Sequence, residues 1–250
     1  MYAMVNVMNS IVVTGSSSGI GRAITEYCLP DYQVVGLARR QPTVLTEHPH
    51  YQAVVIDFAQ LESLAVTLAS LTTELPPPAA IICSAGYGQF GGIEQFSLAQ
   101  MQRLMNVNFL SQAVVVKAFL PKMKRAGCGK IIFIGSEAAL AGEKQGGLYC
   151  ASKFALRGLS QSLRKECANS GLSVTLINPG MTDTDFFAEL TFAPKDTRVH
   201  ALQPKHIVDA VAAVLAADAH CVWEEINLQP ITKAVVKRKK TTAVDCDKRD

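Results

Sequence analysis

The sequence has few charged residues and lacks any long apolar run. Asp, Glu, Lys and Arg make up 18% of the 250 residues, whereas hydrophobic residues make up 49%. This balance excludes a disordered chain, which combines low hydrophobicity with high net charge. No apolar run approaches the ~18 residues of a membrane-spanning helix. No basic segment precedes an apolar one near the N-terminus, since the first Lys or Arg is Arg22. We therefore expect a cytoplasmic protein without a membrane segment.

Paired cysteines and clustered metal ligands are missing as well. The seven cysteines are odd in number, scattered, and include no C-x-x-C pair. Buried thiols in a reducing compartment are therefore expected instead of a disulfide framework. His48 and His50 lie in a polar turn, with no further ligands nearby. We predict no metal site.

What the chain does contain is an alternation of Val- and Ile-rich segments with segments of helical periodicity. The predicted strands are residues 11–13, 33–37, 51–56, 79–83, 130–134, 173–177 and 225–228. The predicted helices are residues 19–29, 61–75, 98–123, 147–168 and 204–217. Such alternation is typical of a parallel sheet covered on both faces. The sequence predicts one α/β domain over residues 1–232, a doubly wound sheet of about seven strands with helices on both faces.

The end of the chain differs in composition from the rest. Residues 233–250 contain seven basic and three acidic residues, including the run K-R-K-K at 237–240. Such a run also suits nucleic acid or anionic lipid. A flexible, solubilising terminus is the simpler interpretation. We predict a flexible basic tail and no nucleic-acid partner.

The first predicted strand leads into a glycine-rich turn and then a helix. Residues 14–21 read T-G-S-S-S-G-I-G. In a dinucleotide-binding fingerprint, Gly15 permits the tight turn, Gly19 lets the backbone approach the pyrophosphate, and Gly21 allows close helix–strand packing. The helix N-terminus offers N–H groups and a positive dipole end to the phosphates. This context predicts a Rossmann fold. The predicted cofactor-binding residues of the turn are Gly15, Ser17, Ser18, Gly19, Ile20 and Gly21.

The second predicted strand ends without the acidic residue that would hydrogen-bond the ribose hydroxyls of NAD. Ala38-Arg39-Arg40 stands there instead. Arg39 and Arg40 suit charge-assisted hydrogen bonds to a 2′-phosphate. The plainer alternative is an exposed basic loop without a binding role. We predict NADP(H) as the cofactor, in preference to NAD(H).

A serine, a tyrosine and a lysine occur together later in the chain. Tyr149 and Lys153 are four residues apart and share one face of a predicted helix. An unperturbed tyrosine has a pKa of about 10, and a nearby ammonium favours the phenolate. Ser136 is placed to hydrogen-bond a carbonyl oxygen while Tyr149 transfers the proton. Alone, Y-x-x-x-K also describes a half-buried aromatic beside a solvated lysine.

The turn T-G-x-x-x-G-I-G, followed about 120 residues later by Ser136, Tyr149 and Lys153, resembles the classical short-chain dehydrogenase/reductase family, NADP-preferring type. The resemblance extends roughly from Ile11 to Leu228. It implies Ser136, Tyr149 and Lys153 as catalytic residues, and Asn108, in N-V-N-F, as the anchor of a proton-relay water. Cys83 departs from the asparagine that most members carry. Further cofactor contacts are implied at Asp57, Phe58, Ser84, Ala85, Gly86, Asn108, Tyr149, Lys153, Pro179, Gly180, Thr182 and Thr184.

The resemblance implies an NADP(H)-dependent oxidoreductase that interconverts a carbonyl and a secondary alcohol, with Tyr149 as general acid/base. The alternative is a catalytically silent NADP(H)-binding sensor or scaffold, although such proteins typically lose the Tyr or the Lys.

Residues 181–202 are expected to form much of the substrate wall. Its phenylalanines suit an apolar carbonyl compound and its cations suit a carboxylate. The pattern I-N-L-Q-P-I-T at 226–232 is similar to that of bacterial members that oxidise 3-hydroxy acids. A 3-hydroxy acid and a small ketone or aldehyde both stay open as substrates. The side chains concerned are Phe186, Phe187, Phe192, Lys195, Arg198 and His200.

The helices that carry Asn108 and Tyr149 are apolar on more than one side. A helix that is apolar beyond the stripe facing its own sheet must bury the remainder elsewhere. We therefore expect a homodimer or homotetramer. The apolar residues concerned are Phe109, Leu110, Val114, Val115, Val116, Phe154, Leu156, Leu159 and Leu163.

Overall fold

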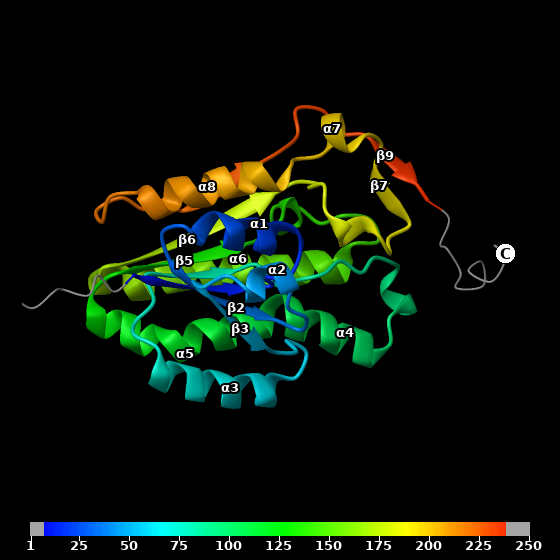
Figure 1. The fold of residues 1–250 in the computed structure, drawn as a ribbon. Helices are drawn as coiled ribbons and strands as arrows, with labels where there is room; N and C mark the ends of the chain where they lie inside the picture. Colours follow the sequence, from blue (N-terminus) through cyan, green and yellow to red (C-terminus); the bar gives the residue numbers. More distant parts are fainter. Residues whose placement is uncertain (1–7, 239–250) are drawn as a thin grey trace, which may run out of the picture.

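The computed structural model describes residues 8–238 and contains a seven-stranded parallel sheet (Figure 1). The strand order is β3-β2-β1-β4-β5-β6-β8, and every neighbouring pair is parallel. Each predicted strand is present, with ends shifted by at most two residues. The strands of this sheet are β1 (Ser10–Thr14), β2 (Gln33–Ala38), β3 (Tyr51–Val55), β4 (Ala80–Cys83), β5 (Gly129–Ile134), β6 (Leu172–Pro179) and β8 (Glu225–Leu228).

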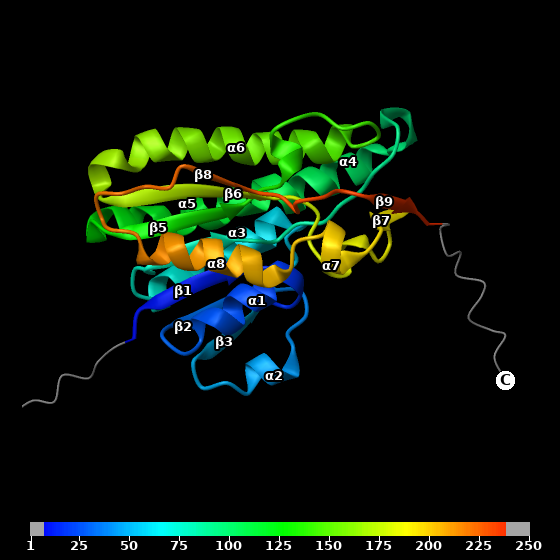
Figure 2. The same cartoon turned by 90° about the horizontal axis from the view of Figure 1, so that it is seen from above.

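Helices cover both faces of the sheet, which confirms the predicted Rossmann-like α/β fold. Figure 1 shows α1 and α8 above the sheet and α3 and α5 below it, and Figure 2 shows α1 and α8 from their own side. The helices are α1 (Gly19–Cys28), α2 (Thr43–Thr46), α3 (Leu61–Glu74), α4 (Leu98–Met105), α5 (Ser111–Ala126), α6 (Gly147–Cys167), α7 (Thr197–His200) and α8 (Pro204–Ala216).

Alternate residues of each central strand enter different cores, as expected for a strand buried on both faces. In β5, Ile131 and Phe133 pack with α3, α5 and α6, whereas Ile132 packs with α1 and α8. All three side chains are fully buried.

The six described cysteines are all free thiols. Four of them are buried, including Cys83 in β4, and Cys128 and Cys221 are exposed.

The helix predicted over residues 98–123 is interrupted by a π-helical turn, η2 (Asn106–Leu110). There the Ser111 N–H reaches back five residues to the Asn106 carbonyl. The whole stretch Leu98–Ala126 meets the length and composition of a membrane-spanning helix, the one such helix in the described part of the chain. It packs on the sheet instead, through Val115 and Phe119.

A second, two-stranded sheet was not predicted. β7 (Phe192–Pro194) pairs antiparallel with β9 (Val235–Lys237), and Figures 1 and 2 both show the pair at one end of the molecule, beside α7. Because β9 lies inside 233–250, this part of the expected tail is an ordered strand. Residues 239–250, with half of the K-R-K-K run, lie outside the described residues.

Candidate active site

A cleft of about 1250 Å³ lies where the carboxyl ends of the sheet strands meet. Strand β1 pairs with both β2 and β4, so the chain leaves β1 and β4 in opposite directions and a crevice opens between the two loops. Thr14 holds these loops together, because its Oγ1 accepts hydrogen bonds from the N–H groups of Ser84 and Ala85, both at 2.9 Å. Of the predicted catalytic and cofactor-binding residues, all except the fully buried Asn108 line this cleft.

The glycine-rich turn has the geometry of an anion-binding cradle. Gly19 has a φ of +54°, which favours glycine, and a Cβ at Gly21 would lie 2.2 Å from the Gly15 carbonyl oxygen. The first turn of α1 has no acidic residue, and the N-cap Ser18 makes no side-chain cap. The N–H groups of this turn are therefore available to a phosphate. These residues fit the pyrophosphate of a dinucleotide.

Basic and hydroxyl side chains gather beside this cradle. Arg39 and Arg40 line the cleft. A neighbouring recess of about 230 Å³ is formed by Ser17, Ser18, Arg40, Gln41 and Pro42, and none of these five carries a negative charge. The recess therefore fits an anionic group attached to the cofactor.

Gln41 is a member of this recess that sequence reasoning missed. Its Nε2 donates to the carbonyl oxygens of Gly36 and Val54, at 3.1 and 3.0 Å, and its Oε1 accepts from the Tyr51 hydroxyl at 2.6 Å. The Tyr51 hydroxyl also lies 2.9 Å from the Ser16 hydroxyl. These partners come from different segments, so no local pattern pointed to Gln41.

Tyr149 and Lys153 project from α6 into the cleft and are almost completely buried, with exposed fractions of 7% and 5%. The Lys153 Nζ lies 5.8 Å from the centre of the Tyr149 ring and donates to the Ile134 carbonyl at 3.2 Å. Ser136 follows β5, and its Oγ accepts from the Ala138 N–H at 3.2 Å. The structure thus brings the three predicted catalytic residues to one wall of the cleft.

Burial controls the acidity of this pair. It raises the pKa of Tyr149 to about 12, with hydrogen bonding to Ser136 acting in the opposite direction. Burial also lowers the pKa of Lys153 to about 8. Lys153 was expected to lower the pKa of Tyr149. In the protein without cofactor the pKa of Tyr149 is raised instead, because burial disfavours the charged form of each of the two side chains. The phenol is protonated at neutral pH, as a general acid requires.

Asn108 lies behind this wall, in the π-helical turn. Its Nδ2 donates to the Tyr87 carbonyl at 3.0 Å and to the Ser152 hydroxyl at 3.1 Å, and its Oδ1 accepts from the Tyr87 N–H at 2.9 Å. A Cβ at Gly86 would lie 3.3 Å from the Asn108 Oδ1 and 3.6 Å from the Lys153 Nζ. The glycine therefore keeps open a narrow space between Asn108 and Lys153. The structure places Asn108 next to Lys153, with its side chain bonded to protein groups.

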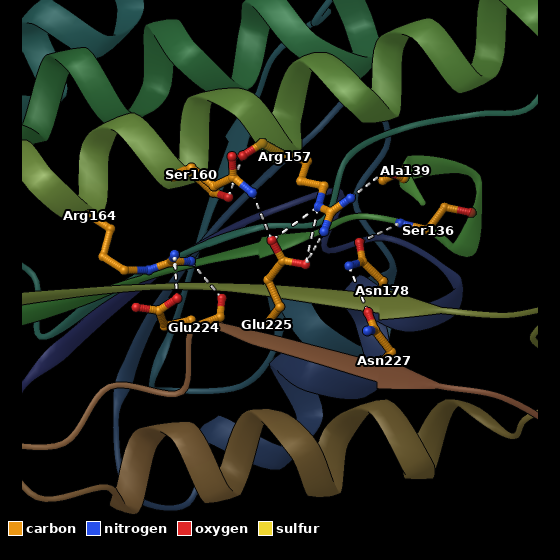
Figure 3. A network of polar contacts seen from close by, with 10 residues as sticks. Ser136, Ala139, Arg157, Ser160, Arg164, Asn178, Glu224, Glu225 and Asn227 are labelled. Carbon is orange, nitrogen blue, oxygen red and sulfur yellow. Dashed lines mark hydrogen bonds and ion pairs between the residues drawn. The ribbon is translucent and has the colours of Figure 1, made fainter. Parts of the chain in front are cut away.

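A polar network that the sequence did not reveal lies beside Ser136 (Figure 3). The Asn178 Oδ1 accepts from the Ser136 N–H at 3.3 Å, and its Nδ2 donates to the Asn227 Oδ1 at 2.9 Å. Arg157 of α6 makes a two-pronged ion pair with Glu225 of β8, and this contact lowers the pKa of Glu225. The network ties the Ser136 loop and α6 to the edge of the sheet.

The remaining predicted cofactor contacts follow other strands. Asp57 and Phe58 follow β3, and the Asp57 Oδ1 accepts from the Ala59 N–H at 3.0 Å. Thr184 precedes the 3₁₀ turn η5 (Asp185–Phe187), and its Oγ1 accepts from the Phe186 N–H at 3.3 Å. The other cleft-lining contacts are Ser84, Ala85, Gly86, Pro179, Gly180 and Thr182.

The segment expected to form the substrate wall does so over only part of its length. Phe186, Phe187 and Phe192 line the cleft. Lys195, Arg198 and His200 are not among the lining residues, and Arg198 forms an ion pair with Asp196 at 3.4 Å. The structure therefore places these three basic residues outside the lining of the cleft.

Comparisons with known proteins agree with this geometry. The family model described as short chain dehydrogenase matches residues 9–194. Human retinol dehydrogenase 8 is 33% identical over 193 residues, covering 72% of this chain and 61% of that protein. An uncharacterized oxidoreductase of Schizosaccharomyces pombe is 31% identical over 186 residues, covering 73% of this chain and 64% of its own length. The chain thus matches less than two thirds of either relative.

Among solved structures, an alcohol dehydrogenase from the archaeon Thermococcus sibiricus, complexed with 5-hydroxy-NADP, superposes with a TM-score of 0.79. It is 26% identical, and the match covers 91% of this chain and 98% of that one. The likeness therefore extends over nearly the whole chain.

Proposed function

The chain belongs to the short-chain dehydrogenase family, and we propose that it is an oxidoreductase that uses NADP(H) to interconvert a carbonyl compound and a secondary alcohol. The observation that carries this proposal is the meeting of Ser136, Tyr149 and Lys153 in one cleft with the glycine-rich turn. A sensor or scaffold would not need a buried phenol beside a buried ammonium, which is costly to keep in a folded protein.

The residues divide the chemistry among them. The nicotinamide cofactor, when bound, supplies the hydride for reduction and accepts it in oxidation. The Ser136 hydroxyl donates a hydrogen bond to the substrate carbonyl oxygen and so orients it. The Tyr149 hydroxyl gives its proton to that oxygen during reduction and takes it back during oxidation. The Lys153 ammonium binds the ribose hydroxyls of the cofactor. Together with Asn108, it also belongs to the route by which a proton returns to Tyr149.

NADP(H) is the preferred cofactor in this proposal. Arg39 and Arg40 line the cleft, and the recess beside the turn carries hydroxyl, amide and guanidinium groups. A guanidinium group favours a phosphate through paired, charge-assisted hydrogen bonds. The alcohol dehydrogenase of Thermococcus sibiricus was solved with an NADP derivative, which supports the same choice.

The proposal is tested by replacing Tyr149 with phenylalanine. Tyr149→Phe removes the proton donor and keeps the ring, so turnover should fall by about 10²–10⁴-fold while NADPH still binds. Turnover is followed by the change in nicotinamide absorbance, and binding by calorimetry. Tyr27→Phe, which removes the same atom from a half-exposed position on α1, is the matched control and should keep full activity. Residual activity of Tyr149→Phe above a tenth of the wild type would contradict the acid role.

We further propose that the protein is a homodimer or homotetramer that pairs through α6. Leu110 and Phe154 are 38% and 43% exposed, and the elements that carry them pack side by side. The exposed stripe of α6 continues through Gly147, Ala151 and Gly158, whose small size permits close approach of a second helix. Val115, Val116, Leu156 and Leu163 belong to the molecule's own core instead. A single species near 26.9 kDa in sedimentation at micromolar concentration would contradict the proposal.

The free thiols of the described cysteines are consistent with a reducing compartment, and we propose the cytoplasm.

A further inference from the structure

Five aromatic rings form a closed circuit of contacts that includes Tyr149. The ring centres of Phe90 and Phe186 lie 5.1 and 5.9 Å from that of Tyr149. Phe192 lies 4.9 Å from Phe90, and Phe187 lies 5.2 Å from Phe186. Phe187 and Phe192 close the circuit at 6.0 Å. The planes are tilted or edge-to-face, as aromatic pairs prefer. The candidate proton donor is thus one member of an apolar cluster.

The four phenylalanines come from three segments, of which the loop after β4 lies far in the chain from η5 and β7. Phe90 follows β4, Phe186 and Phe187 form η5, and Phe192 begins β7. Gly88 lets two of these segments meet, because a Cβ there would lie 2.4 Å from the Phe186 ring.

The cluster differs from the hydrophobic core in its exposure. Core rings such as Phe119 and Phe133 are fully buried, whereas Phe90, Phe186 and Phe192 are only partly buried. All four phenylalanines of the cluster line the cleft. Their accessible faces form a wall that a ligand can contact.

Carboxylates and ammonium groups are nearly balanced in the cleft-lining segments that follow β5, β6 and β8. Besides Lys153, four carboxylates and two ammonium groups of these segments line the cleft. One of the two ammonium groups, that of Lys233, forms an ion pair with Glu137. Neither a carboxylate nor an ammonium substituent of a substrate would therefore meet a large excess of opposite charge. The charged residues counted are Glu137, Glu143, Asp185, Glu189, Lys144 and Lys233.

The C-terminal segment completes the wall. Lys233 and Val235 line the cleft, although they lie about 40 residues after Phe192 in the chain. The pairing of β9 with β7 brings them there, and the Arg238 N–H donates to the Thr191 carbonyl at 2.7 Å. The cleft therefore has an apolar side, formed by rings and Val235, and an ion pair at its edge.

We propose that the substrate of this site is an uncharged ketone, or the corresponding secondary alcohol, whose larger substituent is apolar and packs on Phe90, Phe186 and Phe192. The inference rests on the proposed oxidoreductase function and selects among its substrates. In reduction, the carbonyl carbon gains the hydride of NADPH and the carbonyl oxygen gains the Tyr149 proton, which leaves NADP⁺ and the alcohol. The apolar wall holds the substituent and keeps water from the reacting carbon.

The test compares methyl ketones that differ only in the substituent. The full-length protein with NADPH should reduce 4-phenylbutan-2-one and 2-octanone with kcat/KM at least about 30-fold above that of acetoacetate, since burial of an apolar side group is worth this much. 4-Aminobutan-2-one is the cationic counterpart and should be as poor as acetoacetate. An equal or higher kcat/KM for acetoacetate or the amine would overturn the inference while leaving the oxidoreductase function intact.

A pair of variants tests the wall itself. Phe192→Leu and Phe186→Leu keep an apolar side chain but remove the ring, and should raise the KM for 4-phenylbutan-2-one about fivefold to tenfold with a smaller change in kcat. Trp223→Ala removes a half-exposed aromatic that does not line the cleft, and should leave the KM unchanged. Unchanged KM values in both phenylalanine variants would also overturn the inference.

A binding measurement tests the proposed substrate class independently of the proposed reaction. Saturation-transfer NMR on the Tyr149→Phe protein, which retains the aromatic wall, should show 4-phenylbutan-2-one in contact with the protein and acetoacetate not. If binding follows this order but no ketone is reduced by the unmodified enzyme, the proposed reaction is wrong and the apolar site stands. If acetoacetate binds equally well, the apolar site is wrong.

Discussion

The glycine-rich turn and the aromatic wall face the same cleft, but the chain builds them in different ways. The turn is made of backbone, at the place where β1 ends and α1 begins. The wall is made of side chains from the loop after β4, from η5 and from β7, and β9 supports it from the C-terminal end. The first contains basic and hydroxyl groups at its edge, and the second contains phenylalanines and carboxylates.

Because of this difference, the turn and the wall suit different tasks: binding of the cofactor and choice of the substrate. A backbone cradle presents N–H groups whatever the neighbouring side chains are, so it suits the phosphates that every dinucleotide carries. A wall of side chains changes with each substitution, so it suits the choice of substrate. We expect substitutions in the turn to act on cofactor binding of any kind, and substitutions in the wall to act on particular substrates.

The largest effect on cofactor binding is expected from a substitution in the glycine-rich turn, and it would sharpen the comparison between turn and wall. Gly21→Ala places a Cβ 2.2 Å from the Gly15 carbonyl oxygen, so the helix must move away from the strand and the N–H groups from the phosphates. NADPH and NADH should both bind at least about 100-fold more weakly in calorimetry, since several charge-assisted hydrogen bonds are lost together. Gly142→Ala, at a position where a Cβ meets no atom within 4 Å, is the control and should bind normally.

The thermal unfolding temperature of the Gly21→Ala protein is measured as well, to show whether the variant is folded. A Gly21→Ala protein that unfolds near the wild-type temperature and still binds NADPH normally would contradict the cradle.

A smaller and more selective effect is expected at the basic edge. Arg39→Asp should weaken NADPH by about 10-fold or more and NADH by much less, because a carboxylate repels the 2′-phosphate and accepts from a free ribose hydroxyl. The ratio of the two kcat/KM values measures the change in preference. Arg125→Asp makes the same charge change at an exposed site outside the cleft and should leave the ratio unaltered. Equal losses with both cofactors would show that Arg39 is structural.

The smallest effect is expected from the ion pair at the edge of the wall. The Glu137 carboxylate raises the pKa of Tyr149, and Lys233 partly compensates that charge. Lys233→Met should therefore raise the pKa of Tyr149 further. Reduction needs the protonated phenol, so its decline at high pH should move upward, by roughly 0.3 pH unit for a partly exposed pair.

The pH–rate profile of ketone reduction measures this shift. Lys195→Met, at an exposed position that does not line the cleft, is the control. A decline that moves to lower pH would contradict the role given to the ion pair.

The elements that the sequence predicted best are those with strong periodicity. Each of the seven strands of the main sheet was located to within two residues, whereas the helix predicted over residues 98–123 is divided by η2 and ends at Ala126. The strands β7 and β9 were missed because each has only three residues, and because their partners lie about 40 residues apart. Pairing at such a distance leaves no local pattern in the chain.

For the candidate site, the sequence by itself determined the groups whose spacing is short. The turn of residues 14–21 and the pair Tyr149 and Lys153 lie within one or two turns of chain, so local geometry fixes their relation. The lack of an acid beside Arg39 was equally visible.

Only the tertiary structure decided how these groups behave. It buried Tyr149 and Lys153 together, so that the pKa of the phenol is raised and not lowered. It also excluded Lys195 and Arg198 from the cleft and brought Lys233 into it. Burial and long-range contact depend on which distant segments pack together, and the energy of a charge depends on that packing more than on the residue's neighbours in the chain.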